Sequence, residues 1–378
     1  MLINKQNLLI IGSLPPPIGG ATILFDTIMK TEVVRQFNTK MLNFHYSNTV
    51  SSHGKLSIFK VFRLVKYTTT LISVLIFNRI DLVFSAIQFN RIAFTKDILL
   101  ASICKAFGKK TVGCVVGIGL EELYLKSGII RKYIIQYGVS LFDTYIVPSK
   151  ELYLRYFPAD LISCAKIRVV PFGIFTESDL VKTEPFGPSD HIQVLYYSHF
   201  IRSKGIDEVI EAIPIIIKKY SNTSFVFAGA WDTENHRKEI FEIVKRYGLS
   251  SKMTFYGLIT GNKKREILLK SDIYVLPTYF EYEGLPLSIL EAMSYGCAIV
   301  ATDHAAISSV VKDGINGAIC RPRDPEDVAN KIATLIENRS LLLEIRQNNI
   351  KKYKECYTAE LFGKRLAQTL GDISNEKH

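Results

Sequence analysis

The sequence predicts an α/β protein made of two doubly wound domains, each with a parallel sheet, and three observations support this prediction. The chain has 378 residues, which is too long for one ordinary domain and about right for two. Short apolar runs alternate with longer helical patterns, as in consecutive βαβ units. The same alternation restarts after residues 182–190, a polar segment with two prolines and a glycine.

We therefore expect a first domain over residues 1–185, a second over 186–355 and a terminal helical segment over 356–378. Expected strands of the first domain are residues 7–11, 81–84, 110–116 and 144–147. Expected strands of the second are residues 193–197, 224–227, 253–256, 273–276 and 298–301, and its expected helices include 206–219, 234–247 and 286–295. Two such domains place a cleft between the carboxyl ends of their sheets.

Composition excludes several classes of protein. Hydrophobic residues make up 48% of the chain and charged residues 22%, which is the balance of a globular chain with a core. The longest clean apolar runs, such as residues 71–77, fall far short of the roughly 18 residues that span a bilayer. The N-terminus does not read as a signal peptide. The six cysteines form no C-x-x-C pair, so we expect a reducing cytosol and no disulfide framework.

The positive charge is concentrated in the first half. Residues 1–180 contain 21 Lys and Arg against 11 Asp and Glu, whereas the remaining residues contain 26 against 25. No acidic residue occurs between Glu32 and Asp81. Such a one-sided field attracts anionic polymers or an anionic membrane surface.

The most specific motif is E-G-L-P-L-S-I-L-E, from Glu283 to Glu291. Pro286 suits the first residue of a helix, because the N–H that proline lacks would be unpaired there. Glu283 then lies in the loop before the helix and Glu291 lies inside it, where it could accept both hydroxyls of a ribose. The helix start offers bare N–H groups and a positive dipole end to a phosphate. A capped helix with two solvated carboxylates is the alternative, but the strand, Gly-x-Pro and helix in register favour a site. The expected substrate-binding residues here are Gly284, Leu285, Pro286, Leu287 and Glu291.

Two further loops follow strands. In Y-S-H-F-I-R-S-K-G, residues 197–205, Arg202 and Lys204 supply two cations that suit a diphosphate, although lysines at helix starts are usually only solvated. In P-P-P-I-G-G-A, residues 15–21, adjacent Gly19 and Gly20 permit close backbone approach to a ligand. This loop is neither G-x-G-x-x-G nor a P-loop, so neither an NAD site nor ATP hydrolysis is indicated.

The metal and nucleophile motifs of other enzymes are missing. No two aspartates are separated by one residue, and neither G-x-S-x-G nor H-E-x-x-H occurs. We therefore expect a reaction without a metal or other cofactor, in which fixed positive charge stabilises the leaving group.

Taken together, these motifs resemble glycosyltransferase family 4, of the bacterial surface-polysaccharide type. Three further strings fit it: Y-G at 256–257, D-I-Y-V-L-P at 272–277 and D-G-I-N-G at 313–317. The resemblance is strong over about residues 190–335 and weaker in the first domain. It implies the GT-B fold, with two Rossmann-like domains, and a terminal helix that crosses back to the first domain. This chain departs from the family pattern at His199, where Arg is frequent, at Cys114, Val115 and Val116, where a histidine is frequent, and at Ala305 and Ala306, where Gly-Gly is usual.

The resemblance implies retaining transfer of a sugar from a nucleotide-diphosphate donor, with a UDP-sugar favoured over a GDP-sugar, to a lipid-linked glycan. Implied catalytic residues are Glu283, Lys204 and Arg202, and His199, Gly19 and Gly20 join the donor-binding set. Surface-polysaccharide or lipopolysaccharide synthesis at the inner face of the membrane is the implied setting. Two alternatives remain. A nucleotide-sugar epimerase of this fold needs acid–base carboxylates in the first domain, and residues 13–20 contain none. The second alternative is a nucleic-acid-binding protein. The positive charge of the first half would fit this function, but the chain contains no recognised nucleic-acid-binding motif.

Residues 55–66, K-L-S-I-F-K-V-F-R-L-V-K, predict an amphipathic surface helix. Lys55, Lys60, Arg63 and Lys66 fall within one arc, and Ile58, Val61, Phe62, Leu64 and Val65 fill most of the other side. We expect the apolar side to pack on the first sheet and the basic side to bind an anionic membrane reversibly with salt.

Overall fold

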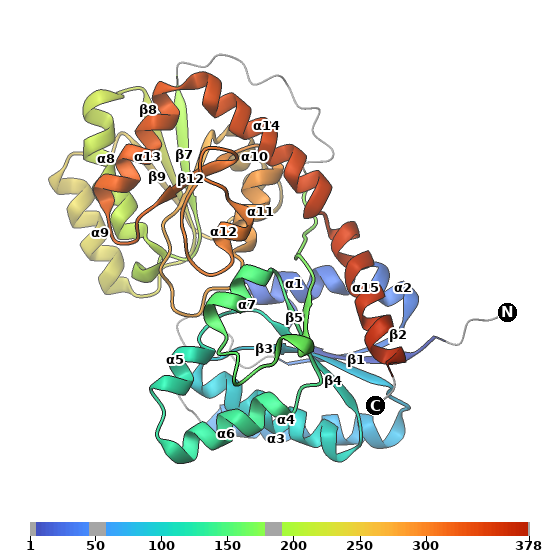
Figure 1. Ribbon diagram of the computed structural model, residues 1–378. Helices are drawn as coiled ribbons and strands as arrows, with labels where there is room; N and C mark the ends of the chain where they lie inside the picture. Colours follow the sequence, from blue (N-terminus) through green and yellow to red (C-terminus); the bar gives the residue numbers. More distant parts are fainter. Residues whose placement is uncertain (1–4, 45–57, 178–190, 377–378) are drawn as a thin grey trace. The chain divides into compact units, whose positions relative to one another are not determined.

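The computed structural model describes residues 5–44, 58–177 and 191–376. These residues form two compact units, each a six-stranded parallel sheet flanked by helices (Figure 1). The first unit comprises Met1–Ile174, Tyr282–Leu285 and Ala359–His378, and the second comprises Phe175–Glu281 and Pro286–Thr358. The expected linker at 182–190, and with it the expected domain boundary, lies outside the described residues.

The first sheet has the strand order β2-β1-β3-β4-β5-β6, and every pairing is parallel. Its central strands are almost continuous runs of buried apolar residues, which is how a strand covered on both faces reads in sequence. The elements of this unit in chain order are β1 (Asn7–Gly12), α1 (Gly20–Ile28), α2 (Glu32–Gln36), β2 (Asn38–Asn43), α3 (Ile58–Phe77), β3 (Leu82–Ile87), α4 (Arg91–Ala106), β4 (Lys110–Val115), α5 (Leu120–Leu125), α6 (Ile129–Ser140), β5 (Thr144–Val147), α7 (Lys150–Tyr156), β6 (Ile167–Val169) and α15 (Ala359–Asn375).

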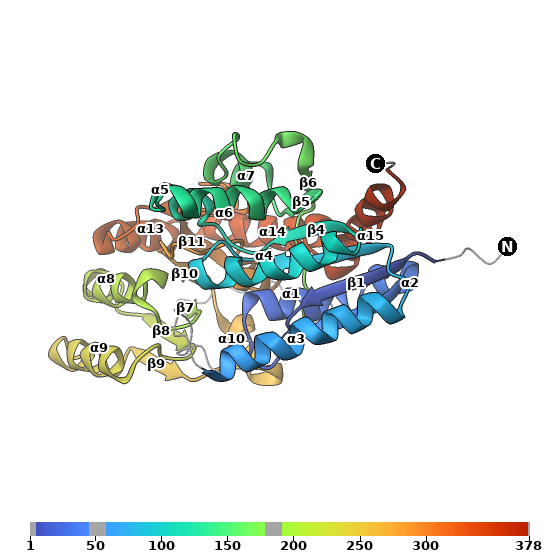
Figure 2. The same ribbon diagram turned by 90° about the horizontal axis from the view of Figure 1, so that it is seen from below.

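Helices α3, α4 and α6 lie side by side on one face of the first sheet, as Figure 2 shows. Leu71 and Leu75 of α3 and Leu100 of α4 pack with Leu9 and Val83 of the sheet in one hydrophobic cluster. On the other face α1, α2 and α15 contact one another. The last helix of the chain is therefore part of the first unit.

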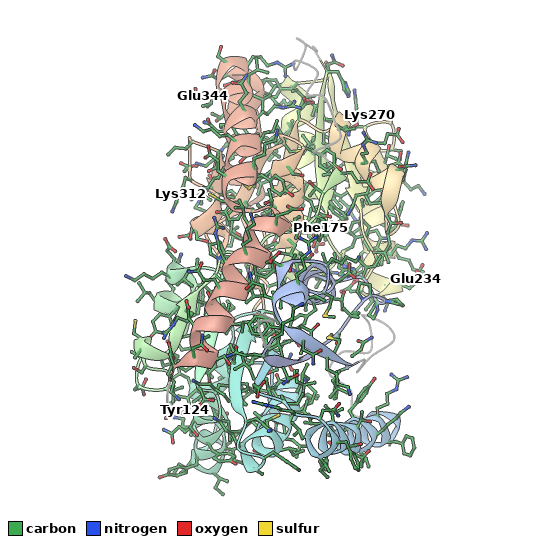
Figure 3. All side chains as sticks on the ribbon, turned by 90° about the vertical axis from the view of Figure 1, so that its right-hand side faces the viewer. Tyr124, Phe175, Glu234, Lys270, Lys312 and Glu344 are labelled. Atoms are coloured by element: carbon green, nitrogen blue, oxygen red, sulfur yellow. The ribbon has the colours of Figure 1, made fainter. Side chains whose placement is uncertain are left out.

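The second sheet has the strand order β12-β11-β10-β7-β8-β9, again parallel throughout. Helix α8 packs on α13, and α11 packs on α14; Glu344 of α14 and Lys270 at the end of α10 are exposed (Figure 3). The elements are β7 (Ile192–Tyr197), α8 (Ile206–Lys219), β8 (Thr223–Ala228), α9 (Glu234–Arg246), β9 (Met253–Tyr256), α10 (Gly261–Lys270), β10 (Ile273–Leu276), α11 (Leu287–Ser294), β11 (Ala298–Thr302), α12 (Ile307–Val310), β12 (Gly317–Cys320), α13 (Pro325–Glu337) and α14 (Arg339–Cys356).

The structure corrects two local predictions. Helix α11 begins at Leu287, and Pro286 is its N-cap rather than its first residue. The helix expected at 55–66 is described from Ile58 and continues to Phe77, and nothing is described of residues 55–57 or of the side chains at 58–61. The predicted apolar side is not all buried: Leu64 packs against the core, but Phe62 is 71% exposed and Val65 56% exposed. The helix is anchored by Leu71 and Leu75, one to three turns further on, which leaves its first turns less covered.

Gly363 tests the attachment of α15 to the first unit. A Cβ at this position would lie 2.3 Å from Cβ of Thr31, a buried residue whose hydroxyl donates to the Ile28 carbonyl. We predict that Gly363→Ala lowers the free energy of unfolding by about 1–3 kcal/mol, as overpacking does. Gly371→Ala, in the same helix but with open space at its Cβ, should be neutral or stabilising. Urea unfolding of both variants measures this, and equal stabilities would contradict the packing.

Candidate functional site

Each sheet has a switch point, where the strand order reverses and the loops after two adjacent strands diverge. Ligands bind at this point in doubly wound folds. In the second sheet β7 lies beside β10, and the order reverses between them. The loops that leave two such strands diverge, and ligands occupy the crevice outside their carboxyl ends. The loop after β7 is the predicted cation loop at residues 198–205. In the first sheet the corresponding strands are β1 and β3, and the loop after β1 contains Gly19 and Gly20.

The cation loop is fixed tightly against β10. Gly205 has φ +83°, and a Cβ there would lie 2.5 Å from the carbonyl oxygen of Pro277. The Tyr279 N–H donates to the Ser203 carbonyl over 2.8 Å, and the Thr278 hydroxyl donates to the same oxygen. Both the positive φ and the lack of space at position 205 require glycine. The turn over Arg202–Lys204 is therefore held in place at the edge of the sheet.

The two cations of this loop have different surroundings. The Lys204 ammonium lies 4.8 Å from the centre of the Phe280 ring, beside the end of β10. The Arg202 guanidinium pairs with Asp207 of α8 and Glu239 of α9. Arg202 thus joins the first turn of α8 to the middle of α9, whereas Lys204 lies at the switch point. His199 lies in the same turn, where its carbonyl accepts from the Ile201 N–H over 2.9 Å.

Glu291 is the centre of a buried polar cluster in the second unit. Glu291 is 5% exposed, and its carboxylate accepts from the Lys264 ammonium of α10 over 2.5 Å. The Tyr197 hydroxyl at the end of β7 also bonds this carboxylate; burial raises the pKa of Tyr197, and the charge of Glu291 raises it further. A buried carboxylate needs such partners, because desolvation without them is costly. Glu291 is therefore held in the middle of α11 by side chains from α10 and β7.

The first turn of α11 is fixed to the same edge. The hydroxyl groups of Ser288 and Tyr274 lie 2.7 Å apart, and Tyr274 donates to the Tyr197 carbonyl over 3.1 Å. The N-cap Pro286 has extended backbone, and Leu287 is buried. Within the second unit, the start of α11 and the end of β7 are thus joined through the Tyr274 hydroxyl.

The other glutamate of the motif belongs to the first unit. Glu283 is 7% exposed, and its carbonyl accepts from the Ile118 N–H over 2.9 Å. A Cβ on Gly284 would lie 2.4 Å from the Val116 carbonyl, and one on Gly117 would lie 2.5 Å from the Tyr282 carbonyl. Segment Tyr282–Leu285 therefore packs on the loop after β4, backbone against backbone. Glu283 and Glu291 are assigned to different compact units.

Gly19 and Gly20 lie at the start of α1, and none of the described residues comes close enough to require glycine there. Gly19 is the N-cap with extended backbone, and its N–H donates to the Thr22 hydroxyl. A Cβ on Gly20 would meet no atom within 4 Å. Neither backbone strain nor crowding explains the pair.

Some features of the site have no clear sequence signal. Lys264 is one of three cations in the run Lys263, Lys264 and Arg265, and only the fold shows which one reaches Glu291. Ala305 takes a left-handed conformation, φ +51°, at the position where glycine was expected from the resemblance. Cys114 lies in the core, and burial raises the pKa of its thiol.

Over residues 5–44, 58–177 and 191–376, no group of three or more His, Cys, Asp or Glu is arranged to hold a metal ion. In that same part of the chain, no helix is both long and apolar enough to cross a bilayer.

Comparison with known proteins agrees with this fold. Residues 181–354 match the family model described as Glycosyl transferases group 1. A Campylobacter jejuni protein named N,N'-diacetylbacillosaminyl-diphospho-undecaprenol alpha-1,3-N-acetylgalactosaminyltransferase is 30% identical over 209 residues, 53% of this chain and 52% of that protein. Alpha-D-kanosaminyltransferase of Streptomyces kanamyceticus is 24% identical over 190 residues, 50% and 48% of the two chains. This chain spans about half the length of these curated relatives.

Solved structures match over nearly the whole chain. The Anabaena protein HepE, in complex with UDP and glucose, superposes with a TM-score of 0.72 at 16% identity, covering 97% of this chain and 100% of that one. Sucrose-phosphate synthase of Thermosynechococcus elongatus superposes with a TM-score of 0.75 at 18% identity, covering 98% and 99%. The protein has the GT-B fold of glycosyltransferases, and the fold prediction is confirmed.

The two loop glycines Gly284 and Gly20 make a matched pair for stability. We predict that Gly284→Ala lowers the free energy of unfolding by about 1–3 kcal/mol, because its Cβ would meet a backbone carbonyl that cannot move aside. Gly20→Ala should leave stability unchanged or slightly raised. Thermal and urea unfolding of the two variants decide this. A destabilised Gly20→Ala protein would show that the first loop is packed more tightly than described.

Proposed function

We propose that this protein transfers a sugar from a nucleotide-diphosphate donor to a lipid-linked glycan, with retention at the anomeric carbon and without a metal. The observation that carries the proposal is the pair formed by Lys204 at the switch point and Glu291 in the buried cluster, both in the unit that the glycosyl transferases model matches. The UDP complexes of HepE support UDP as the nucleotide, with GDP second. The name of the Campylobacter relative supports a diphospho-polyprenol acceptor.

Departure of the nucleoside diphosphate is the difficult step, because negative charge grows on its phosphates. Lys204 supplies a fixed ammonium from a turn that Gly205 locks to β10. The N-terminus of α11 adds bare N–H groups near Leu287 and Ser288, and Gly20 offers its N–H at the start of α1. Open space at the Cβ position of Gly20 leaves room for a phosphate oxygen. Arg202 contributes indirectly, through its ion pairs with α8 and α9.

Glu291 accepts the ribose hydroxyls in this proposal. The bonds from Lys264 and Tyr197 orient the carboxylate, and a carboxylate has enough lone pairs to accept more. Glu283 binds a hydroxyl of the transferred sugar and stabilises the oxocarbenium-like transition state. The acceptor hydroxyl attacks from the face that the diphosphate leaves, and a phosphate oxygen takes its proton. The setting is surface-polysaccharide synthesis, with the enzyme bound at the cytoplasmic face of the membrane.

The first test separates Lys204 from Arg202. We predict that Lys204→Ala lowers kcat by about 10²–10³-fold, as removal of one oxyanion donor does, while donor affinity falls by less. Arg202→Ala, the matched control, should lower kcat by less than about tenfold, because its charge is used by Asp207 and Glu239. The assay follows UDP release from UDP-hexoses and UDP-N-acetylhexosamines with a short polyprenyl-diphosphate glycan, and NMR gives the anomeric configuration. A strict requirement for Mg²⁺ after EDTA treatment, or an inverted product, would contradict the mechanism.

The second test concerns Glu291. We predict that Glu291→Gln weakens UDP binding by about 1.5–3 kcal/mol in calorimetry, because hydrogen bonds to a charged acceptor are lost. Glu266→Gln is the control: this residue lies on α10 beside Lys264, but its ion pairs with Lys263 and Lys270 are at the surface. Unchanged UDP affinity in Glu291→Gln would remove the residue from the donor site.

A further inference from the structure

Helix α6 has apolar residues on two sides, and only one side is buried. Ile135, Gly138 and Val139 face inward, and a Cβ on Gly138 would lie 2.5 Å from Ile98 of α4. The outward side is formed by Ile129, Ile130, Tyr133, Ile134 and Tyr137, whose exposed fractions run from 48% to 79%. The exposed side of a surface helix normally carries polar and charged residues, not apolar ones. Among the described residues, none covers this outward side.

Leu125, at the end of the preceding helix α5, is also 65% exposed, and α5 contacts α6. Positions 129/130, 133/134 and 137 recur at helical spacing, so they stand in adjacent rows along one face. We call Leu125, Ile129, Ile130, Tyr133, Ile134 and Tyr137 the α6 band. A contiguous apolar band of this kind marks an interaction site, unlike scattered surface residues.

The charges around the α6 band are mostly positive. Arg131 and Lys132 lie on α6 itself, Arg91 begins α4, and Lys132 lies 5.0 Å from the ring of Tyr124 (labelled in Figure 3). Among the described residues, neither Arg91 nor Arg131 takes part in an ion pair. Burial and then the nearby charge of Arg91 lower the pKa of Arg131. On α5, Glu121 and Glu122 are the nearby acids, and Glu122 is paired with Lys126. Two neighbouring guanidinium groups without a carboxylate favour an anion.

The whole helical row repeats this charge pattern. Helices α3, α4 and α6 together contain eight Lys and Arg and one acid, Asp97, which is buried and paired with Lys96. Phe62 and Val65 of α3 and Leu99 of α4 are exposed in the same row. Apolar and aromatic side chains among cations are the pattern of a surface that enters the headgroup region of an anionic bilayer.

We propose that the α6 band inserts into the interface of an anionic lipid bilayer, with Arg91, Arg131 and Lys132 binding the headgroups. A second copy of the chain fits less well, because a two-fold contact here would place these cations against their own copies. This inference rests on the proposed function in one respect: binding at this surface would bring the enzyme to its lipid-linked acceptor. It differs from the sequence-based expectation of binding through the basic side of residues 55–66, because apolar insertion resists salt.

Vesicle co-sedimentation of the full chain tests this inference, with phosphatidylcholine vesicles that contain or lack phosphatidylglycerol, and no glycan or donor present. We expect the wild type to bind the anionic vesicles and to retain a bound fraction at high salt. The double variant Ile130→Glu, Tyr133→Glu should lower the partition coefficient by at least about tenfold and abolish the salt-resistant fraction. Arg91→Glu, Arg131→Glu should remove the salt-sensitive part.

The matched control places the same changes on the second unit: Ile315→Glu with Tyr247→Glu, residues that are 61% and 55% exposed. It should bind vesicles like the wild type. UDP affinity, measured on every variant, shows that each is folded and reports on the proposed function separately. Equal vesicle binding by the α6 variant and the control would overturn the proposal. The proposal would also be overturned if the wild type did not bind vesicles but formed a dimer, and the α6 variant were a monomer.

Discussion

The close approach of residues 202–205 to the end of β10 is the constraint on which the second unit's site depends. The strand order puts β7 beside β10, and Gly205 lets the chain turn without a side chain between it and Pro277. Any larger residue would have to displace the Pro277 carbonyl. The turn that results gives Lys204 a fixed position, so its charge needs no reorganisation when a phosphate leaves.

A second set of contacts fixes the carboxylates. Glu291 is buried, and its desolvation is offset by the Lys264 ion pair and the Tyr197 hydroxyl, so that α10, α11 and β7 all depend on one side chain. Glu283 is fixed differently, through backbone contacts of Gly284 and Gly117 that leave no room for side chains. Hydrogen-bonding side chains thus orient the Glu291 carboxylate, whereas main-chain packing positions the segment that contains Glu283.

Much of this arrangement was predictable because it is encoded locally. The βαβ alternation gave two parallel sheets, and residues 283–291 read as loop and then helix from Gly284, Pro286 and the apolar spacing that follows. The ion pairs of Arg202 were not predictable, because Asp207 and Glu239 are brought together by tertiary packing. The same holds for Lys264, which no local pattern distinguishes from its neighbours. Exposure at Phe62, Val65 and the α6 band was missed, since periodicity shows that a face is apolar but not whether anything covers it.

Hydrogen–deuterium exchange with and without UDP tests the central claim most directly, because it locates the bound nucleotide along the chain. If the diphosphate binds at the switch point of the second sheet, UDP should protect amides in residues 198–205 and in the first turn of α11 from Leu287 onward. Protection should be weak or absent in α13, which packs on α8. Binding of UDP with protection confined to other segments, or with none at residues 198–205, would contradict the account.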